Sequence, residues 1–324
     1  MTKLQFVLLI SLVLFITAPI FNPSTILVAP SNIYNIHTLH GTSTNWAGYA
    51  VETNLNTPQN GAITDVKGSW IVPTVLGSVT PNAYSASWIG IDGYSSNSVE
   101  QIGTDSNVNN GIAVYAAWYE MFPKAAVYLG MTINAGDTIS AEVNYLGQGN
   151  FRLSITDVTT GASFSTIQKS SHAVNGVFLN PVISGGREHV FVGNTRPLTI
   201  TELTTITAAY DTYPNVQYTT ISPMTFLANK GGLSGAPHRS SAEWIIEAPS
   251  NLNNGEVLPL ANFRTAYFFN SQVTVNGVTG FINNAHWQHD AIIMQTSTSS
   301  PIIKAQPSLL STDGTRFSVT WQHQ

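Results

Sequence analysis

Two neighbouring stretches, "DTISAEVNYL" (137–146) and "FRLSITDVTTG" (151–161), decide the fold class of this chain. Both are rich in β-branched and aromatic residues, and Gly, Asn or Asp lies at or next to their ends. Apolar and polar residues alternate within them, which places one kind of side chain on each face of an extended strand. The pattern is typical of half-buried β-strands.

Similar short runs recur from residue 42 to the end of the chain. We interpret as strands the runs at 68–75, 85–93, 112–123, 241–248, 266–277, 289–296 and 316–322, with turn signals at 134–138 and 275–280. There is no long amphipathic helix and no internal repeat. Many short strands at even spacing predict an all-β sandwich or jelly roll.

Alternation also predicts which side chains share a face. In "SAEWIIEA" (241–248), Glu243, Ile245 and Glu247 point one way, and Ala242, Trp244 and Ile246 point the other way. By the same rule Trp88 shares a face with Asp92, Trp118 with Glu120, and Gln101 with Val99. Several strands therefore present a polar group beside an aromatic residue or a glycine, which suits a concave sheet face that binds a ligand.

The composition limits the possible functions. Only 9% of the 324 residues are charged, against about 25% in an ordinary soluble protein. The net charge of −5 and the lack of a basic run give no sign of a nucleic-acid partner. A chain with few carboxylates has little to lose in acid, where paired carboxylates are protonated. The absence of cysteine excludes disulfides, zinc–thiolate sites and cysteine nucleophiles.

The chain divides into three predicted parts. Residues 1–22 contain Lys3 and a long apolar run, which indicates a signal peptide or an N-terminal anchor, and residues 23–42 are a short linker or pro-segment. Residues 43–324 form the β-sandwich domain, with an insertion at about 172–238 where the strand alternation slips. We expect a secreted, extracellular protein that meets a membrane only if the first segment is retained, with no stable partner implied.

Eight segments in a fixed order carry a family resemblance. They are "TNWAGYA" (44–50), "GSWIVP" (68–73), "SASWIGIDG" (85–93), "VEQIGTD" (99–105), "YAAWYEMFP" (115–123), "INAGDTI" (133–139), "SAEWIIEAP" (241–249) and "LPLANF" (258–263). In them the chain resembles the eqolisins, the acid-acting glutamic endopeptidases, over roughly residues 43–168 and 240–324. It departs from the family pattern in its insertion and in lacking the cysteines of many fungal members.

The resemblance implies a concanavalin-like double antiparallel β-sandwich and a catalytic pair formed by Gln101 and Glu247. It implies no metal and no cofactor, and a polypeptide as the substrate. The residues that fall on the cleft motifs, as substrate-binding or supporting groups, are Trp46, Trp88, Asp92, Asp105, Trp118 and Glu120.

The residue types suit this chemistry. Peptide hydrolysis needs a base for the attacking water and later an acid for the leaving nitrogen, and a Glu with a pKa near ~4.3 can serve as both in mildly acidic solution. A Gln amide keeps its N–H donors at any relevant pH and can stabilise the developing oxyanion. This explains why Glu247 lies in so apolar a run.

Two other functions fit the same pattern. A jelly-roll glycoside hydrolase could use Glu120 and Glu247, whose carboxyl groups would lie ~5–5.5 Å apart in a retaining enzyme. A non-catalytic, lectin-like surface protein would present a shallow aromatic face. The segment "HWQHD" (286–290) places its two His on opposite faces of a strand and has no third partner, so we expect no metal site there.

Overall fold

The computed structural model describes residues 41–76, 81–96, 98–122, 124–170, 180–184, 187–191, 217–218, 237–251 and 256–324. Throughout these residues the chain is all-β, as predicted, and none of them belongs to a helix long and apolar enough to cross a membrane. The strands are β1 (Thr42–Ser43), β2 (Trp46–Glu52), β3 (Ile63–Ile71), β4 (Ala86–Ile91), β5 (Val99–Asn109), β6 (Ile112–Phe122), β7 (Val127–Tyr128), β8 (Thr138–Gly147), β9 (Asn150–Asp157), β10 (Ser163–Lys169), β11 (Asn180–Ser184), β12 (Arg187–Phe191), β13 (Gln217–Tyr218), β14 (Ser241–Glu247), β15 (Thr265–Val275), β16 (Val278–Phe281), β17 (Gln288–Gln295), β18 (Ile303–Pro307) and β19 (Phe317–Trp321).

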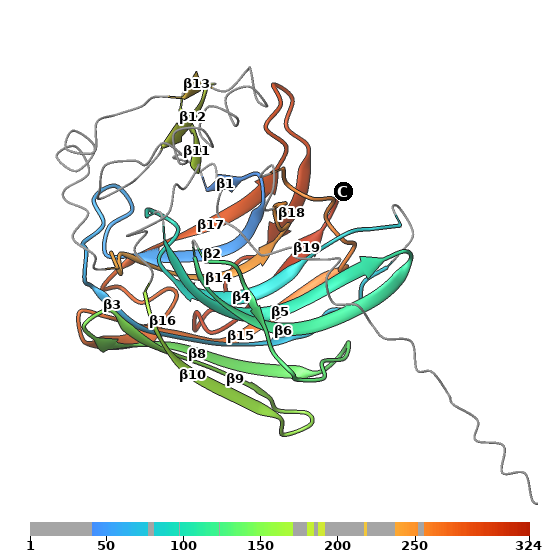
Figure 1. Cartoon of the computed structure of the whole chain (residues 1–324). Helices are drawn as coiled ribbons and strands as arrows, with labels where there is room; N and C mark the ends of the chain where they lie inside the picture. The colour runs from blue at the N-terminus through green and yellow to red at the C-terminus, as the bar shows by residue number, and fades with distance from the viewer. Residues whose placement is uncertain are drawn as a thin grey trace, which may run out of the picture.

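One continuous, almost wholly antiparallel sheet folds over on itself to make two layers. Its strand order is β10-β9-β8-β3-β15-β19-β18-β17-β2-β14-β4-β5-β6-β7. Figure 1 shows β2, β14, β4, β5 and β6 as one layer above the layer of β3, β15, β8, β9 and β10. Strands β17, β18 and β19 connect the two layers, so both layers of the predicted sandwich belong to one hydrogen-bonded sheet.

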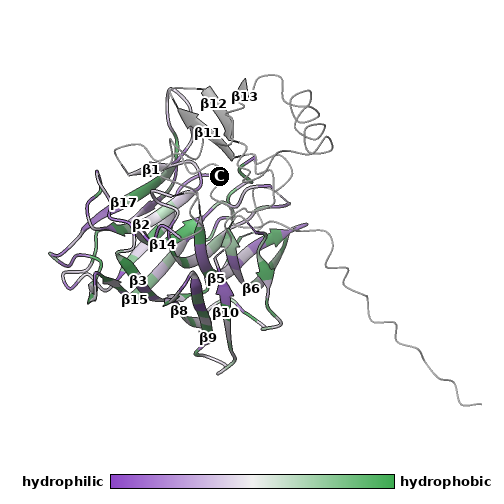
Figure 2. Cartoon of the chain, turned by 60° about the vertical axis from the view of Figure 1, so that its left-hand side comes forward, coloured by the Kyte–Doolittle hydropathy of each residue, from purple (hydrophilic) through white to green (hydrophobic). Residues whose placement is uncertain are grey.

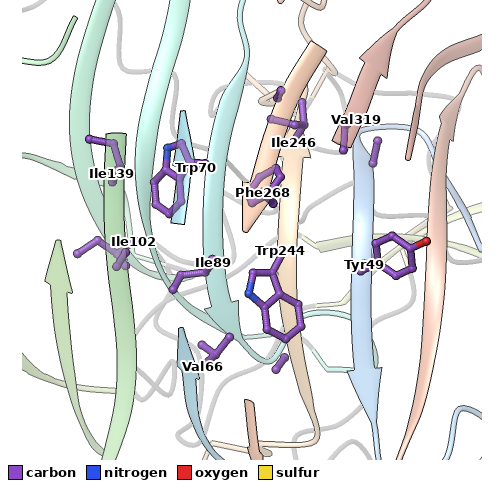
Figure 3. Packing of buried hydrophobic residues seen from close by; sticks show 14 of the residues in the cluster. Tyr49, Val66, Trp70, Ile89, Ile102, Ile139, Trp244, Ile246, Phe268 and Val319 are labelled. Atoms are coloured by element: carbon purple, nitrogen blue, oxygen red, sulfur yellow. The ribbon is translucent and has the colours of Figure 1, made fainter. Parts of the chain in front are cut away.

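Apolar side chains from the two layers meet in one core. Trp244, Ile89 and Ile102 of the upper layer pack against Trp70 and Phe268 of the lower layer, all of them 1% exposed or less (Figure 3). Two indole N–H groups donate across the layers, which removes the cost of burying them without a partner. Trp244 Nε1 donates to the Lys67 carbonyl at 2.8 Å, and Trp70 Nε1 donates to Thr104 Oγ1 at 2.9 Å.

Central strand β14 shows how alternation divides the two faces of the upper layer. Ala242, Trp244 and Ile246 point into the sandwich core, whereas Ile245 belongs to a second apolar cluster on the opposite face, together with Trp46, Trp88 and Trp118. The predicted faces of this strand are therefore confirmed. Hydrophobic and hydrophilic residues are interleaved along the strands in Figure 2, as such alternation requires.

Several predicted segments fall outside the described residues. They are the leader 1–22, nearly all of the linker 23–42 and most of the insertion 172–238. Within the insertion, β11, β12 and β13 form a separate three-stranded sheet. The chain is described again from residue 237, where it leads directly into β14.

Candidate active site

The strand register of the upper layer brings the predicted site residues onto one face. Residues directly opposite each other in an antiparallel ladder point to the same side of the sheet. Three successive rows cross β14, β4, β5 and β6. They are Glu247–Ala86–Asp105–Ala116, Ile245–Trp88–Gly103–Trp118 and Glu243–Gly90–Gln101–Glu120. Gln101 and Glu247 therefore share the face predicted for them, two strands apart.

Glu247 is fully buried at the end of β14, and neutral donors hold its carboxylate. Trp88 Nε1 donates to Oε2 at 2.8 Å, and Asn45 Nδ2 donates to Oε1 at 3.2 Å. Asn45 is itself fixed by Ser43, whose Oγ donates to Asn45 Oδ1 at 3.0 Å. The Asn45 amide and the Trp88 indole are uncharged, so these two groups orient the oxygens of Glu247 without adding a charge.

Gln101 is bound to Glu120, its direct partner across the β5–β6 ladder. Gln101 Nε2 donates to Glu120 Oε2 at 2.5 Å, and each residue is 1% exposed. Burial raises the pKa of Glu120 well above its ordinary value, and the nearby Glu247 raises it further. Glu120 therefore interacts with both residues of the predicted pair: it accepts a hydrogen bond from Gln101, and the charge of Glu247 raises its pKa.

Asp105 lies in the same row as Glu247, with only the small side chain of Ala86 between them. Its Oδ2 accepts hydrogen bonds from Tyr128 Oη at 3.0 Å and from Asn107 Nδ2 at 3.2 Å. Burial raises the pKa of Asp105 to about 7 despite these donors. The residue is therefore a mostly protonated neighbour of the site in acid.

Three tryptophans form the apolar part of this face. Trp46 and Trp88 pack edge to face with ring centroids 4.9 Å apart, and Trp118 belongs to the same cluster. Gly103 lies between Trp88 and Trp118, where a Cβ atom would come within 2.6 Å of Trp88 Cβ and 2.5 Å of the Ser87 carbonyl. A glycine at this position is what allows the two indoles to approach each other.

Asp92 lies at the opposite end of β4 from Ala86, the ladder partner of Glu247. It is fully buried, and its carboxylate accepts the N–H of Arg239 at 2.6 Å and the N–H of Ser240 at 2.9 Å. These bonds tie the end of β4 to the residues that enter β14. The structure therefore gives Asp92 a supporting position, separated from the Glu247 carboxylate.

A second group of carboxyl groups gathers near Asp92. Tyr94 contacts two members of this group. Its Oη donates to Asp290 Oδ2 at 2.5 Å, and its N–H donates to Glu243 Oε1 at 3.3 Å. Glu243 and Glu52 are fully buried. Burial, followed by the charges of Asp92 and Asp290, raises the pKa of Glu52 to about 7. We call Glu52, Asp92, Glu243 and Asp290 the covered carboxyl group.

Sequence reasoning missed two of these features. Asn45 was inside the quoted segment "TNWAGYA", but nothing in strand alternation identifies a residue just before a strand as a contact of Glu247. Tyr94 follows "WIGIDG", in a loop that no periodicity places over the sheet. Among the described residues, no group of three His, Cys, Asp or Glu side chains is arranged to hold a metal ion.

Comparison with known proteins agrees with this arrangement. The model of the Peptidase A4 family matches residues 44–177 and 198–306. Aspergillopepsin-2 of Aspergillus niger is 28% identical over 159 residues, which are 41% of this chain and 54% of that protein. This chain therefore spans about half the length of that relative.

Solved structures share the fold. A crystal structure of scytalido-glutamic peptidase with a transition state analog inhibitor superposes with a TM-score of 0.56 at 20% identity, covering 86% of this chain and 98% of that one. SCP-B, a member of the eqolisin family of peptidases in complex with the tripeptide Ala-Ile-His, gives a TM-score of 0.52 at 19% identity, with the same coverage.

The sandwich and the matched segments together define the class of glutamic-type peptidases. This chain belongs to the Peptidase A4 family, the eqolisins. The predicted family, fold and enzyme class are thereby confirmed. Membership favours a peptidase over the jelly-roll glycosidase and the lectin-like protein, which the strand pattern alone left open.

Proposed function

We propose that this chain is a secreted, acid-acting endopeptidase in which Glu247 and Gln101 hydrolyse a peptide bond with one activated water. The observation that carries the proposal is the setting of Glu247. It is a fully buried carboxylate that neutral donors from Asn45 and Trp88 orient on the face it shares with Gln101. The substrate is an extended polypeptide lying on that face.

The proposed reaction uses Glu247 twice. Its carboxylate takes a proton from water as the water oxygen attacks the carbonyl carbon of the peptide bond. The resulting acid then gives that proton to the leaving nitrogen as the C–N bond breaks. No net proton is gained or lost by Glu247 over the cycle.

Gln101 stabilises the intermediate between these steps. Its Nε2 carries two hydrogens, and one is directed to Glu120, which leaves the other for the oxyanion. A preorganised donor of this kind can be worth about 3–4 kcal/mol in the transition state, because it needs no rearrangement as the charge develops.

Acid action is supported by the state of the buried acids. In the part of the chain that the structure describes, nine acidic side chains are buried: Glu52, Asp92, Glu100, Asp105, Glu120, Asp137, Asp157, Glu243 and Glu247. Burial raises the pKa of Glu100, Glu120 and Glu243 well above ordinary values. Glu100, Glu120 and Glu243 are neutral in acid, so the free-energy cost of burying them is lowest at low pH.

The test is a digestion. The purified protein is incubated with a denatured protein at pH 2–5 and at pH 7, and product masses are compared with those from the Glu247→Gln variant purified in the same way. We expect internal cleavage products at acidic pH from the native chain alone. Identical products from both proteins, or none from either, would reject the proposal. Release of sugars from oligosaccharides instead would restore the glycosidase interpretation.

Secretion has its own measurement. The protein is collected from the medium of an expressing culture, and its N-terminal residue is determined by mass spectrometry. We expect it in the medium without residues 1–22. Retention in the membrane fraction with Met1 present would identify the segment as an anchor.

A further inference from the structure

The amide of Gln101 has a fixed partner. Its Nε2 lies 2.5 Å from Glu120 Oε2, both side chains are buried, and the two residues are directly opposed in the β5–β6 ladder. Gly90 lies directly opposite Gln101 in the same row, and Gly103 lies in the next row between Trp88 and Trp118.

An amide can point either its oxygen or its nitrogen at a given spot, and the partner decides which. Stabilising an oxyanion requires the nitrogen. With the proton of Glu120 on Oε1, its Oε2 is an acceptor, so it selects the orientation in which Nε2 faces it and the second hydrogen of Nε2 faces away. Without Glu120, rotation about the last side-chain bond would present Gln101 Oε1, which repels an oxyanion.

The charge on Glu120 matters as much as its geometry. The titratable groups that face it are Glu247 from β14, Asp105 from β5 and Tyr128 from β7. Burial and Glu247 keep the pKa of Glu120 high. A neutral Glu120 leaves Glu247 as the charged acid beside the water, whereas an ionised Glu120 would oppose both the charge on Glu247 and the oxyanion.

Resting on the proposed function, we propose that Glu120 is the positioning residue of Gln101, acting as an uncharged acceptor that keeps Nε2 turned toward the substrate. The active enzyme then has Glu247 ionised and Glu120 protonated. Activity falls in strong acid as Glu247 is protonated, and it falls toward neutral pH as Glu120 ionises.

Two variants separate geometry from charge. In Glu120→Gln the side-chain oxygen still accepts from Gln101 but no group there can ionise. We expect kcat near pH 3–4 within about threefold of the native value, and a high-pH limb of kcat/KM displaced upward by about one pH unit or more. Glu120→Ala removes the acceptor, so kcat should fall about 10–100-fold with little change in KM.

Glu100 provides the matched control. It is the residue before Gln101 on β5, is equally buried, and also has a raised pKa, but its ladder partners Ile91 and Met121 belong to the sandwich core. Glu100→Gln should leave the high-pH limb where the native enzyme has it. Initial rates are taken only at pH values where circular dichroism shows each variant folded.

The outcomes are distinguishable. A native protein with no peptidase activity defeats the proposed function itself. An active native protein with an unmoved high-pH limb in Glu120→Gln defeats the role of Glu120, whether or not Glu120→Ala folds. An equal loss of kcat in the Gln and Ala variants would also overturn it, since the proton of Glu120 would then be the essential feature.

Discussion

The upper layer carries buried acids in two regions that differ in what surrounds them. At the end of β14, Glu247 receives hydrogen bonds from the side chains of Asn45 and Trp88. In the covered carboxyl group, Glu52 has only the nearby Ser95 hydroxyl to lower its pKa, and burial outweighs that contact. Both Glu247 and Glu52 are fully buried, so burial alone does not distinguish them.

The two regions differ in how many hydrogen-bond donors of the protein surround the buried carboxyl group. The neutral donors Asn45 and Trp88 replace part of the water that the Glu247 carboxylate loses on burial. At Glu52 burial outweighs the one nearby donor, the Ser95 hydroxyl, and the pKa rises to about 7. The end of β14 therefore suits the proposed proton transfer, whereas in the covered carboxyl group the Glu52 carboxyl stays protonated over an acidic range.

The largest expected effect on activity comes from changing Glu247 at the end of β14. Glu247→Gln keeps the shape of the side chain and a hydrogen-bonding oxygen but cannot take or give a proton. We predict that peptidase activity falls by about 10⁴-fold or more at every pH from about 2 to 7, while the protein still folds. Cleavage rates and circular dichroism measure this. A folded variant that cleaves at the native rate would show that the proton carrier lies elsewhere.

The next largest effect is expected from removing the proposed oxyanion donor. Gln101→Ala should lower kcat by about 10²–10³-fold with the fold retained. Gln306→Ala, an exposed glutamine on β18, is the matched control and should leave kcat unchanged. Near-native turnover in a folded Gln101→Ala protein would remove this residue from the mechanism.

A smaller effect sharpens the role of the neutral donors. Asn45→Ala deletes the bond to Glu247 Oε1, and one such bond corresponds to a fall in kcat/KM of about tenfold. Asn144→Ala, which removes a side-chain amide from β8 in the other layer, is the control. If the two variants have equal activity, Asn45 does not help to hold the carboxylate in its working position.

The smallest effect concerns the covered carboxyl group and is a change in stability. A folded-state pKa raised from 4.5 to about 7 means that the native state binds the Glu52 proton more tightly than the unfolded state does. This contribution is complete below about pH 4.5 and is lost as the pH rises toward 7. We predict a melting temperature that falls between pH 4 and pH 7.

Glu52→Gln should raise the free energy of unfolding at pH 7 by about 1–3 kcal/mol and change it little at pH 3. Calorimetry at the two pH values measures both quantities. The control is Glu142→Gln, which removes a partly exposed carboxylate 2.8 Å from Lys67 and should give no gain at pH 7. An equal gain at pH 3 and pH 7 would contradict the linkage to protonation.

Strand alternation predicted much of this arrangement because its period is built into the backbone. The runs at 241–248, 112–123 and 137–146 correspond to β14, β6 and β8 within a residue or two at each end. Alternation also gave the correct face for Ile245 and Trp244, since a buried strand cannot slip by one residue without reversing both faces.

Contacts that depend on three-dimensional approach could not be predicted in this way. Asn45 and Glu247 are 202 positions apart, and only the pairing of β2 with β14 brings them together. The position of Tyr94 over Asp290 depends on the path of a loop. The bond from Gln101 to Glu120 required the register of β5 against β6, which alternation restricts to a face but does not fix to a residue.

Because β14 pairs between β2 and β4 but comes much later in the sequence, the proposed active site can be completed only late in synthesis. A ribosome delivers Asn45, Trp88, Gln101 and Glu120 long before residues 241–247 emerge to enter between β2 and β4. Until then the edges of those two strands lack their partner, and contacts so distant in sequence form slowly. Under the proposed mechanism, the half-made chain therefore holds Gln101 but lacks Glu247, the group that would transfer the proton.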